Sequence, residues 1–396
     1  MQPVLILFIS LFLYSSASPI VPADDEDGHL TVPEIITKYG YPAEVHNVVT
    51  SDGYILTLHR IPHGKNMDTV STKPVLVQHG LLSSSADWVI TGVEHGLGFI
   101  LADEGYDVWL GNGRGNYNSR NHTTLDPNTD AEFWHFSWHE IGAIDIPAMI
   151  DHILETTGQP NLYYVGHSQG TTVFYVMATT RPEYNDKIKA HFSLAPIAYM
   201  KHMTSPLMQI LAYFVGPIDA LFEMIGWNEF LPNNELITLA GETLCKDEEV
   251  TQELCSNVLF VMCGYSPSEL NETILPVLMG HLPAGASTRQ VVHYGQEIVS
   301  GYFRQYDFGD DNMDVYGSSE PPSYDLSLIT APSYLFYSHN DWMAAEVDVV
   351  RLCEEMGDSC NKFLVSEDSF NHLDYLIGMR APELVYAKVI SLMARH

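Results

Sequence analysis

The chain has 396 residues, of which 46% are hydrophobic, so it carries enough apolar side chains for a sizeable core and is neither fibrous nor disordered in composition. Its 18 Lys and Arg are outnumbered by 50 Asp and Glu, which gives a formal net charge of −32 at pH 7 with His neutral. A chain this acidic is not expected to bind nucleic acid or to be attracted electrostatically to anionic membranes.

The N-terminal residues predict a secretory signal peptide. An apolar run at residues 4–13 has the length of a signal-peptide core, and small residues follow it, so we expect residues 1–17 to be removed by cleavage near Ala17. The run is too short for a comfortable transmembrane span, and no later stretch approaches 18 uninterrupted apolar residues. Residues 18–30, with the acidic run from Asp24 to Asp27, are predicted to be a solvated leader, with a processed propeptide as the alternative.

Strand and helix patterns alternate from about residue 45 to 198 and again from 331 to 396. Such alternation predicts a mostly parallel sheet flanked by helices. Residues 199–325 are helical and loop-rich in pattern and show no clear strand series. We therefore expect a core made of residues 31–198 and 326–396, with residues 199–325 inserted as a helical cap over one edge of the sheet.

An early strand is predicted at residues 74–78, and it leads into His79-Gly80-Leu81-Leu82. A His-Gly turn after such a strand suits an oxyanion hole, in which the backbone amide of Leu81 would be one donor. The alternative is that Gly80 only ends a core strand.

The pentapeptide Gly166-His167-Ser168-Gln169-Gly170 lies between a predicted buried strand at residues 162–165 and a predicted helix at residues 171–179. Glycines on both sides of the serine allow a sharp strand-to-helix turn that exposes the hydroxyl of Ser168. The amide of Gln169, at the helix N-terminus, would be the second oxyanion donor. This context indicates acyl transfer through a serine ester.

A nucleophilic serine needs a base and an acid that orients it, and behind a strand-turn-helix serine these follow in the order Ser, Asp, His. Asp341 closes a β-type run at residues 332–341 that ends in polar turn residues, and His372 lies in a loop after the short apolar run at residues 362–365. The alternative for any single Asp or His is a surface or capping role. Their order after strand-like segments favours the catalytic interpretation.

The predicted cap contains an unusually apolar stretch from Met203 to Pro232, which has three acidic residues and no basic one. Its large apolar residues are Leu207, Met208, Ile210, Leu211, Phe214, Val215, Leu221, Phe222, Met224, Ile225, Trp227, Phe230 and Leu231. They are either ordinary core packing of the cap helices or the lining of an acyl-chain tunnel and lid face.

The five cysteines are an odd number for the oxidising setting that a signal peptide implies. Cys353 and Cys360 can pair only if Gly357 ends the intervening helix, because about 10 Å of helical rise would otherwise separate them. There is no C-x-x-C pair and no H-E-x-x-H helix that would suggest catalytic zinc. The sequons at Asn121 and Asn271 predict surface glycosylation.

Taken together, these motifs resemble the acid lipases, the family of gastric and lysosomal lipases and their secreted insect relatives. The matching segments are Gly40-Tyr41-Pro42, residues 50–54, 78–82, 105–112, 114–116, 166–170 and 283–285, Tyr306-Asp307, Asn340-Asp341 and residues 371–374. The resemblance covers nearly the whole mature chain and implies an α/β-hydrolase fold with a helical cap.

By this resemblance Ser168, Asp341 and His372 match the catalytic triad, and Leu81 and Gln169 match the oxyanion donors. The resemblance also favours a disulfide between Cys245 and Cys255, which leaves Cys263 buried and free. The chain departs from its relatives at residues 342–348, where a Leu-Ala-Asp run is often found. Asp341 keeps its place directly after the strand and is preferred to Asp348 as the acid.

The resemblance implies a secreted serine ester hydrolase that cleaves neutral lipid at an interface, with triacylglycerol as the first candidate substrate. It needs no cofactor, and no obligate protein partner is inferred. One alternative is a sterol or retinyl ester hydrolase of lysosomes. The other is a lipid carrier that keeps the fold and has lost turnover, although a carrier would not need all three triad residues.

Overall fold

The computed structural model describes residues 26–213, 228–232 and 249–396. Its centre is an eight-stranded sheet in the order β1-β2-β4-β3-β5-β6-β9-β10. β2 pairs antiparallel with β1 and β4, and all other neighbours are parallel, so the expectation of a mostly parallel sheet is confirmed. The strands are β1 (Glu44–Val49), β2 (Ile55–Ile61), β3 (Pro74–Gln78), β4 (Asp107–Leu110), β5 (Leu162–His167), β6 (Ile188–Leu194), β9 (Ser333–Tyr337) and β10 (Cys360–Leu364).

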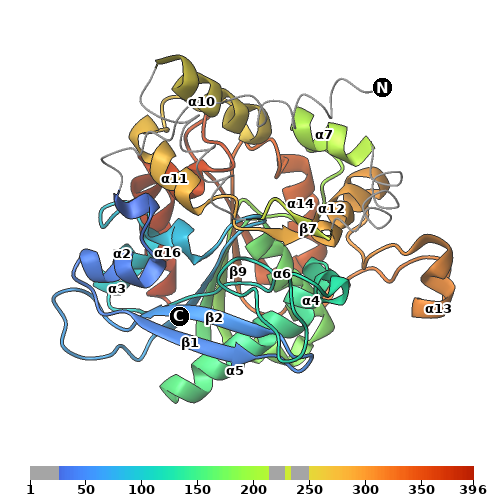
Figure 1. Ribbon diagram of the computed structural model, residues 1–396, viewed down its shortest axis with the longest axis horizontal. Helices are drawn as coiled ribbons and strands as arrows, with labels where there is room; N and C mark the ends of the chain where they lie inside the picture. The colour runs from blue at the N-terminus through green and yellow to red at the C-terminus, as the bar shows by residue number, and fades with distance from the viewer. Residues whose placement is uncertain (1–25, 214–227, 233–248) are drawn as a thin grey trace.

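Helices cover both faces of this sheet, as Figure 1 shows, with α2, α3 and α16 on one side and α4, α5 and α6 on the other. The helices of the core are α2 (Val32–Lys38), α3 (Leu97–Asp103), α4 (Trp138–Glu140), α5 (Ile146–Thr157), α6 (Gln169–Thr180), α14 (Glu346–Met356), α15 (Asp374–Ile377) and α16 (Ala387–Met393). Every residue of β3 and β5 is buried, because parallel central strands lie between two helical layers.

The sheet topology decides where the chemistry-bearing loops meet. β3, β5, β6, β9 and β10 run parallel, so their carboxyl ends lie along one edge of the sheet. The loop after β3 carries Leu81, the turn after β5 carries Ser168, and the loops after β9 and β10 carry Asp341 and His372. Four segments that are far apart in the sequence therefore converge on one edge.

The chain between β6 and β9 adds a separate group of elements, and Figure 1 shows α7, α10 and α11 together above the sheet edge and α13 on a projecting arm. These elements are α7 (Pro206–Tyr213), β7 (Glu229–Phe230), α10 (Glu249–Cys263), α11 (Leu275–His281), β8 (Ala286–Ser287), α12 (Thr288–Ser300) and α13 (Asn312–Tyr316). Within the apolar stretch predicted at residues 203–232, Met203 and Met208 are buried and Ile210 is exposed. Residues 214–227 of that stretch lie outside the described residues.

The predicted signal peptide, residues 1–17, also lies outside the described residues, as does most of the predicted leader. Asp27, at the end of the acidic run, accepts hydrogen bonds at 2.7 Å from Lys38 Nζ and from Tyr39 Oη. Asp27 is thus attached to α2 where a solvated leader was expected. No helix in the described ranges is both long and apolar enough to cross a bilayer.

The cysteine geometry follows the helix boundary expected from the sequence. α14 ends at Met356, and Gly357 has φ 64°, which turns the chain back so that Cys353 and Cys360 form a disulfide. Cys263 is buried and free. Cys255 is disulfide-bonded, and Cys245, its expected partner, lies outside the described residues. The sequon residues Asn121 and Asn271 are exposed, and their glycosylation stays a prediction.

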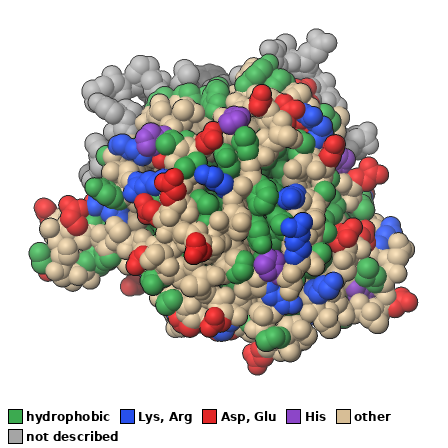
Figure 2. Space-filling view, turned by 180° about the vertical axis from the view of Figure 1, so that it is seen from behind, with side chains coloured by type: hydrophobic (Ala, Val, Ile, Leu, Met, Phe, Trp, Pro, Cys, Tyr) green, Lys and Arg blue, Asp and Glu red, His purple; other side chains and the backbone are tan. Residues whose placement is uncertain are grey.

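One face of the molecule carries side chains of both charge signs. Figure 2 shows the face opposite to that of Figure 1, where Lys and Arg side chains are interspersed with Asp and Glu. This face therefore presents no continuous basic surface of the kind that tracks a phosphate backbone.

Candidate active site

Ser168 lies on the turn between β5 and α6, with φ 52° and ψ −119°. A positive φ is strained for a residue with a side chain, and such strain is stored where function requires it. The surrounding glycines make the turn possible. A Cβ on Gly166 would lie 2.5 Å from the carbonyl oxygen of Gly170, and a Cβ on Gly170 would lie 2.2 Å from that of Gln78. Only glycine fits at either position, so the pentapeptide is the local cause of the sharp turn.

Ser168, His372 and Asp341 form one continuous chain of hydrogen bonds. Ser168 Oγ lies 2.8 Å from His372 Nε2, and His372 Nδ1 lies 2.9 Å from both carboxylate oxygens of Asp341. The carboxylate also accepts hydrogen bonds from two backbone amides, those of Met343 at 2.9 Å and Ala344 at 2.8 Å. The structure thus brings together the three residues selected from the sequence, and a hydroxyl in this arrangement can lose its proton to the imidazole as it attacks a carbonyl.

The neighbouring acid, Asp348, has a different environment. It lies on α14, it is buried, and its carboxylate accepts hydrogen bonds at 2.8 Å from the backbone amide and from Nδ1 of His202. These contacts attach α14 to the chain that follows β6. The geometry therefore supports Asp341, and not Asp348, as the partner of His372.

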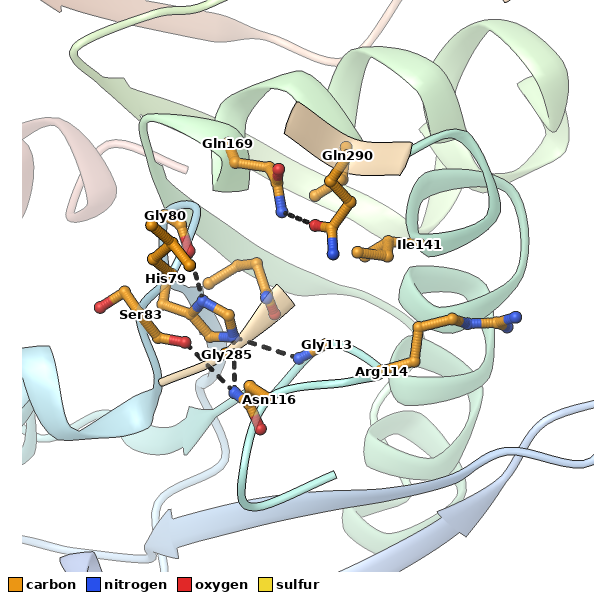
Figure 3. A pocket seen from close by; sticks show the side chains of 13 residues that line it. His79, Gly80, Ser83, Gly113, Arg114, Asn116, Ile141, Gln169, Gly285 and Gln290 are labelled. Atoms are coloured by element: carbon orange, nitrogen blue, oxygen red, sulfur yellow. Dashed lines mark hydrogen bonds between the residues drawn. The ribbon is translucent and has the colours of Figure 1, made fainter. Parts of the chain in front are cut away.

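The loop after β3 lies directly against the serine, since a Cβ on Gly80 would be 3.2 Å from Cβ of Ser168. His79 holds this loop, as Figure 3 shows: its Nε2 accepts from the amide of Gly113 and from Asn116 Nδ2, both at 3.1 Å. Its Nδ1 must then carry the proton and donate to the carbonyl of Gly80 at 2.8 Å. Because the peptide unit is planar, the N–H of Leu81 points away from His79.

Burial keeps the His79 ring neutral, since it lowers the pKa of His79 to about 4. The second amide predicted for an oxyanion hole belongs to Gln169, the first residue of α6, where backbone N–H groups have no intrahelical partner. The Gln169 side chain is turned away and donates to Gln290 Oε1 on α12 at 2.7 Å (Figure 3). The backbone amide of Gln169 lies in the first turn of α6, next to Ser168, and helix N-termini favour negative charge.

Comparisons with known proteins identify the lineage. Residues 32–92 match the family model described as a partial alpha/beta-hydrolase lipase region, and residues 73–223 match that of the alpha/beta hydrolase fold. Gastric triacylglycerol lipase of Rattus norvegicus is 40% identical over 372 residues, which cover 93% of this chain and 92% of that protein. Lysosomal acid lipase/cholesteryl ester hydrolase of Homo sapiens is 39% identical over 378 residues, 94% of this chain and 93% of that protein.

The chain belongs to the acid lipase family. Lipase 1 of Drosophila melanogaster is 42% identical over 373 residues, with 93% of this chain and 81% of that protein covered. A solved structure of a Sulfolobus solfataricus protein superposes with a TM-score of 0.58 at 14% identity, over 90% of this chain and 95% of that one, and it supports the α/β-hydrolase fold alone. This acid lipase is accordingly a carboxylic ester hydrolase.

Three residues near the centre of this acid lipase were not selected from the sequence. His79 and Asn116 hold the loop after β3, and His167, next to the serine, donates through Nε2 to the carbonyl of His372 at 2.8 Å. Burial lowers the pKa of His167 to about 3, so its ring also stays neutral. A histidine beside the serine was visible in the pentapeptide, but nothing local indicated that it would contact the loop after β10.

Replacing His79 by Ala is expected to lower kcat by up to about 100-fold, which approaches the loss of one oxyanion donor. The physical reason is that Gly80 loses the hydrogen bond that orients the peptide unit of Leu81. The matched control is His59→Ala, because His59 is equally buried and its pKa is also lowered to about 4, but it bonds Ser85. Turnover of p-nitrophenyl butyrate measures the effect on catalysis, and the melting temperature measures the effect on stability. Equal kcat in His79→Ala and His59→Ala would contradict the proposed role of His79 in orienting the Leu81 amide.

A buried carboxyl near this loop gives a pH-dependent prediction. Burial raises the pKa of Asp87 to about 7, while a hydrogen bond from Ser83 opposes the shift. The native carboxyl then keeps its proton between pH 4 and 7 while the unfolded chain loses it, so its contribution to stability is complete below pH 4 and is lost as pH rises through 7. Over this pH range the shift in the pKa of Asp87 corresponds to a decrease in the free energy of unfolding on the order of 4 kcal/mol.

Asp87→Asn is therefore expected to melt at a progressively higher temperature than the parent as pH rises from 4 to 7. Thermal scans of both proteins at several pH values measure this difference. The exposed Asp310→Asn is the control and should show a constant difference. A difference between Asp87→Asn and the parent that does not change with pH would be inconsistent with a protonated native carboxyl.

Proposed function

We propose that this acid lipase is a secreted hydrolase of neutral lipid, first of triacylglycerol, and that it works through an acyl-enzyme on Ser168. The observation that supports the mechanism most directly is the hydrogen-bonded chain from Ser168 Oγ through His372 to Asp341. Triacylglycerol is favoured because a gastric triacylglycerol lipase is 40% identical over 93% of this chain. Cholesteryl ester stays the alternative, because the human relative is a lysosomal cholesteryl ester hydrolase.

In the acylation step His372 Nε2 takes the proton of Ser168 as Oγ attacks the ester carbonyl. Asp341 holds the Nδ1–H tautomer and stabilises the imidazolium that forms. The negative charge on the carbonyl oxygen would be bound by the amides of Leu81 and Gln169, which lie on the two segments flanking the serine. His372 then gives its proton to the leaving alcohol, and the acyl group stays on Oγ as an ester.

In the deacylation step His372 activates a water that attacks the same carbonyl, and the fatty acid leaves as Ser168 recovers its proton. Only 8% of Ser168 and 3% of His372 are exposed. An ester bound at this depth is shielded from bulk water, and the hydrogen bonds to the developing charge are correspondingly stronger.

We propose that residues 199–325 act as the cap that brings lipid to this site. α10 supports this proposal, because it exposes Val258 and Val261, spaced three residues apart, and Tyr265 is exposed just after the helix ends. α7, which contacts α10, exposes Ile210. Apolar side chains on adjacent helices above the sheet edge suit contact with a lipid surface, and the high negative charge leaves apolar contact as the main attraction.

Val261→Asp is expected to lower the rate on emulsified lipid about tenfold, because burying one valine at the lipid surface contributes about 1.5 kcal/mol. Hydrolysis of a soluble short-chain ester should not change. Val49→Asp is the matched control, since Val49 is exposed on the edge strand β1, away from α10. A loss on emulsions that Val49→Asp shares, or a loss on the soluble ester as well, would argue against contact through α10.

Secretion is supported by the signal-like apolar run at residues 4–13 and by the disulfide between Cys353 and Cys360, since disulfides persist in oxidising compartments. Expression of the full chain in a secreting host, with N-terminal sequencing of the product, tests this part. A mature N-terminus near residue 18 in the medium supports it, and retention inside the cell contradicts it.

The substrate is tested by fatty-acid release from emulsified triolein and from cholesteryl oleate between pH 4 and 8, with phosphonate-treated protein as the background. Faster release from triolein is expected. Faster release from cholesteryl oleate would identify sterol esters, and not triacylglycerol, as the preferred substrate class. Lipid transfer without release from either substrate would favour the carrier alternative.

A further inference from the structure

The last turn of α10 lies between the two loops that carry the acid and the base. The carbonyl oxygen of Cys263, the final residue of this helix, accepts hydrogen bonds from the backbone amides of Trp342 and of His372, both at 3.3 Å. Trp342 directly follows Asp341. One carbonyl of the inserted segment is therefore shared by the loop after β9 and the loop after β10, although no strand pairing joins these loops beyond the sheet edge.

The next two residues extend this contact. The carbonyl of Gly264 accepts from Asn371 Nδ2 at 2.8 Å, and the carbonyl of Tyr265 accepts from Asn340 Nδ2 at 2.9 Å. Asn340 immediately precedes Asp341, and Asn371 immediately precedes His372. We call residues Cys263–Tyr265 the α10 clamp, because three successive carbonyls bind the two loops at the residues beside the acid and the base.

Glycine is required at the centre of the clamp. Gly264 has φ 119°, and a Cβ there would lie 2.1 Å from the carbonyl oxygen of Asn340 and 3.1 Å from Cβ of Asn371. The backbone of the clamp therefore packs against both loops with no room for a side chain at residue 264. Asn371 is itself buried, and its Oδ1 accepts hydrogen bonds from the amides of Leu373 and Asp374. The side chain of Asn371 therefore connects the clamp to the residues on both sides of His372.

We propose that the α10 clamp sets the position of Asp341 relative to His372, so that Gly264, Asn340 and Asn371 are positioning residues for the triad. The inference rests on the proposed function of Ser168. Its physical basis is that β9 and β10 fix only the starts of the two loops, while a displacement of about 1 Å in a reacting group can cost about 100-fold in rate. The inserted segment then contributes to the chemistry as well as to covering the site.

The test measures phosphonylation of Ser168 by a p-nitrophenyl alkylphosphonate, followed by release of p-nitrophenolate. This reaction depends on the triad whatever the natural ester is. Asn340→Ala removes the hydrogen bond to the clamp together with a direct one to the carbonyl of Ser369 in the loop after β10, at 2.6 Å. Gly264→Ala forces the clamp away from both loops and leaves that direct hydrogen bond available. Gly158→Ala is the matched control, because Gly158 also has a positive φ, 66°, but an added Cβ meets nothing within 4 Å.

Asn340→Ala and Gly264→Ala, compared at matched folded fractions, are expected to lower the maximal phosphonylation rate about 10- to 100-fold, with the half-saturating phosphonate concentration unchanged. Gly158→Ala should react like the parent. Parental rates in folded Asn340→Ala would overturn the inference, and so would a loss that Gly158→Ala shares. If Gly264→Ala does not fold, a parental rate in Asn340→Ala still overturns the inference. A parent that is phosphonylated but releases no fatty acid from lipid would refute the proposed function and still leave the clamp tested.

Discussion

Replacing Ser168 by Ala is expected to lower kcat for triolein by about a millionfold, the scale of loss measured when a serine hydrolase loses its nucleophile. The alanine cannot form the acyl ester, while the amides of Leu81 and Gln169, the proposed oxyanion donors, would still be in place to bind the carbonyl oxygen. The variant should therefore still hydrolyse the ester about a thousandfold faster than the uncatalysed reaction in water, and substrate binding should change little.

His372→Ala should cost nearly as much as Ser168→Ala, and the double variant little more than either, because the residues act as one unit. The control is Ser193→Ala, since Ser193 is fully buried on β6 and bonds the hydroxyl of Tyr175 at 2.6 Å, away from the site. Fatty-acid titration with purified proteins measures all four rates. Additive losses, or turnover by Ser168→Ala at the rate of the control, would mean that another group is the nucleophile.

Asp341→Asn is expected to lower kcat about ten-thousandfold near neutral pH. An asparagine of the same shape can present its NH₂ group to Nδ1 of His372, which favours the tautomer with the proton on Nε2. That nitrogen, 2.8 Å from Ser168 Oγ, could then no longer accept the serine proton. The amide donors of Met343 and Ala344 would also lose the charged acceptor that they bind.

Asp348→Asn is the control for this variant, because Asp348 is equally buried and also accepts from a histidine, His202. It should lower the melting temperature through the weakened contact with His202 and leave kcat close to that of the parent. Stopped assays of kcat with both variants at matched folded fractions decide the assignment. A larger loss in Asp348→Asn than in Asp341→Asn would reverse it.

The elements with strong local signals could be predicted from the sequence. The predicted strand at residues 74–78 is β3, the run at residues 162–165 lies in β5, and the run at residues 332–341 contains β9. These runs are apolar because the strands are buried between helical layers, and their order sets the order of the loops at the sheet edge. Ser168 and Asp341 could be selected because each follows such a strand, and His372 because it follows the edge strand β10, whose residues are half-buried or exposed.

The parts that escaped prediction depend on contacts between distant segments. Gln290 accepts a hydrogen bond from the side chain of Gln169, 121 positions earlier in the chain. The tautomer of His79 is fixed by the donors that its Nε2 meets, the amide of Gly113 and the side chain of Asn116. Gly264 appears in the sequence as a glycine after a helix, and such a residue usually only ends the helix. Its approach to Asn340 exists only when both loops are in place, so no local pattern could indicate it.

The long separation of the triad along the chain has a consequence for biosynthesis. His372 is placed 2.8 Å from Ser168 although it follows 204 positions later. At about 5–20 residues per second, the ribosome adds those residues in roughly 10–40 s. During that interval the nascent chain holds its serine turn without the base that activates it. If Ser168 acts with His372 as proposed, ester hydrolysis can therefore begin only when translation is nearly complete.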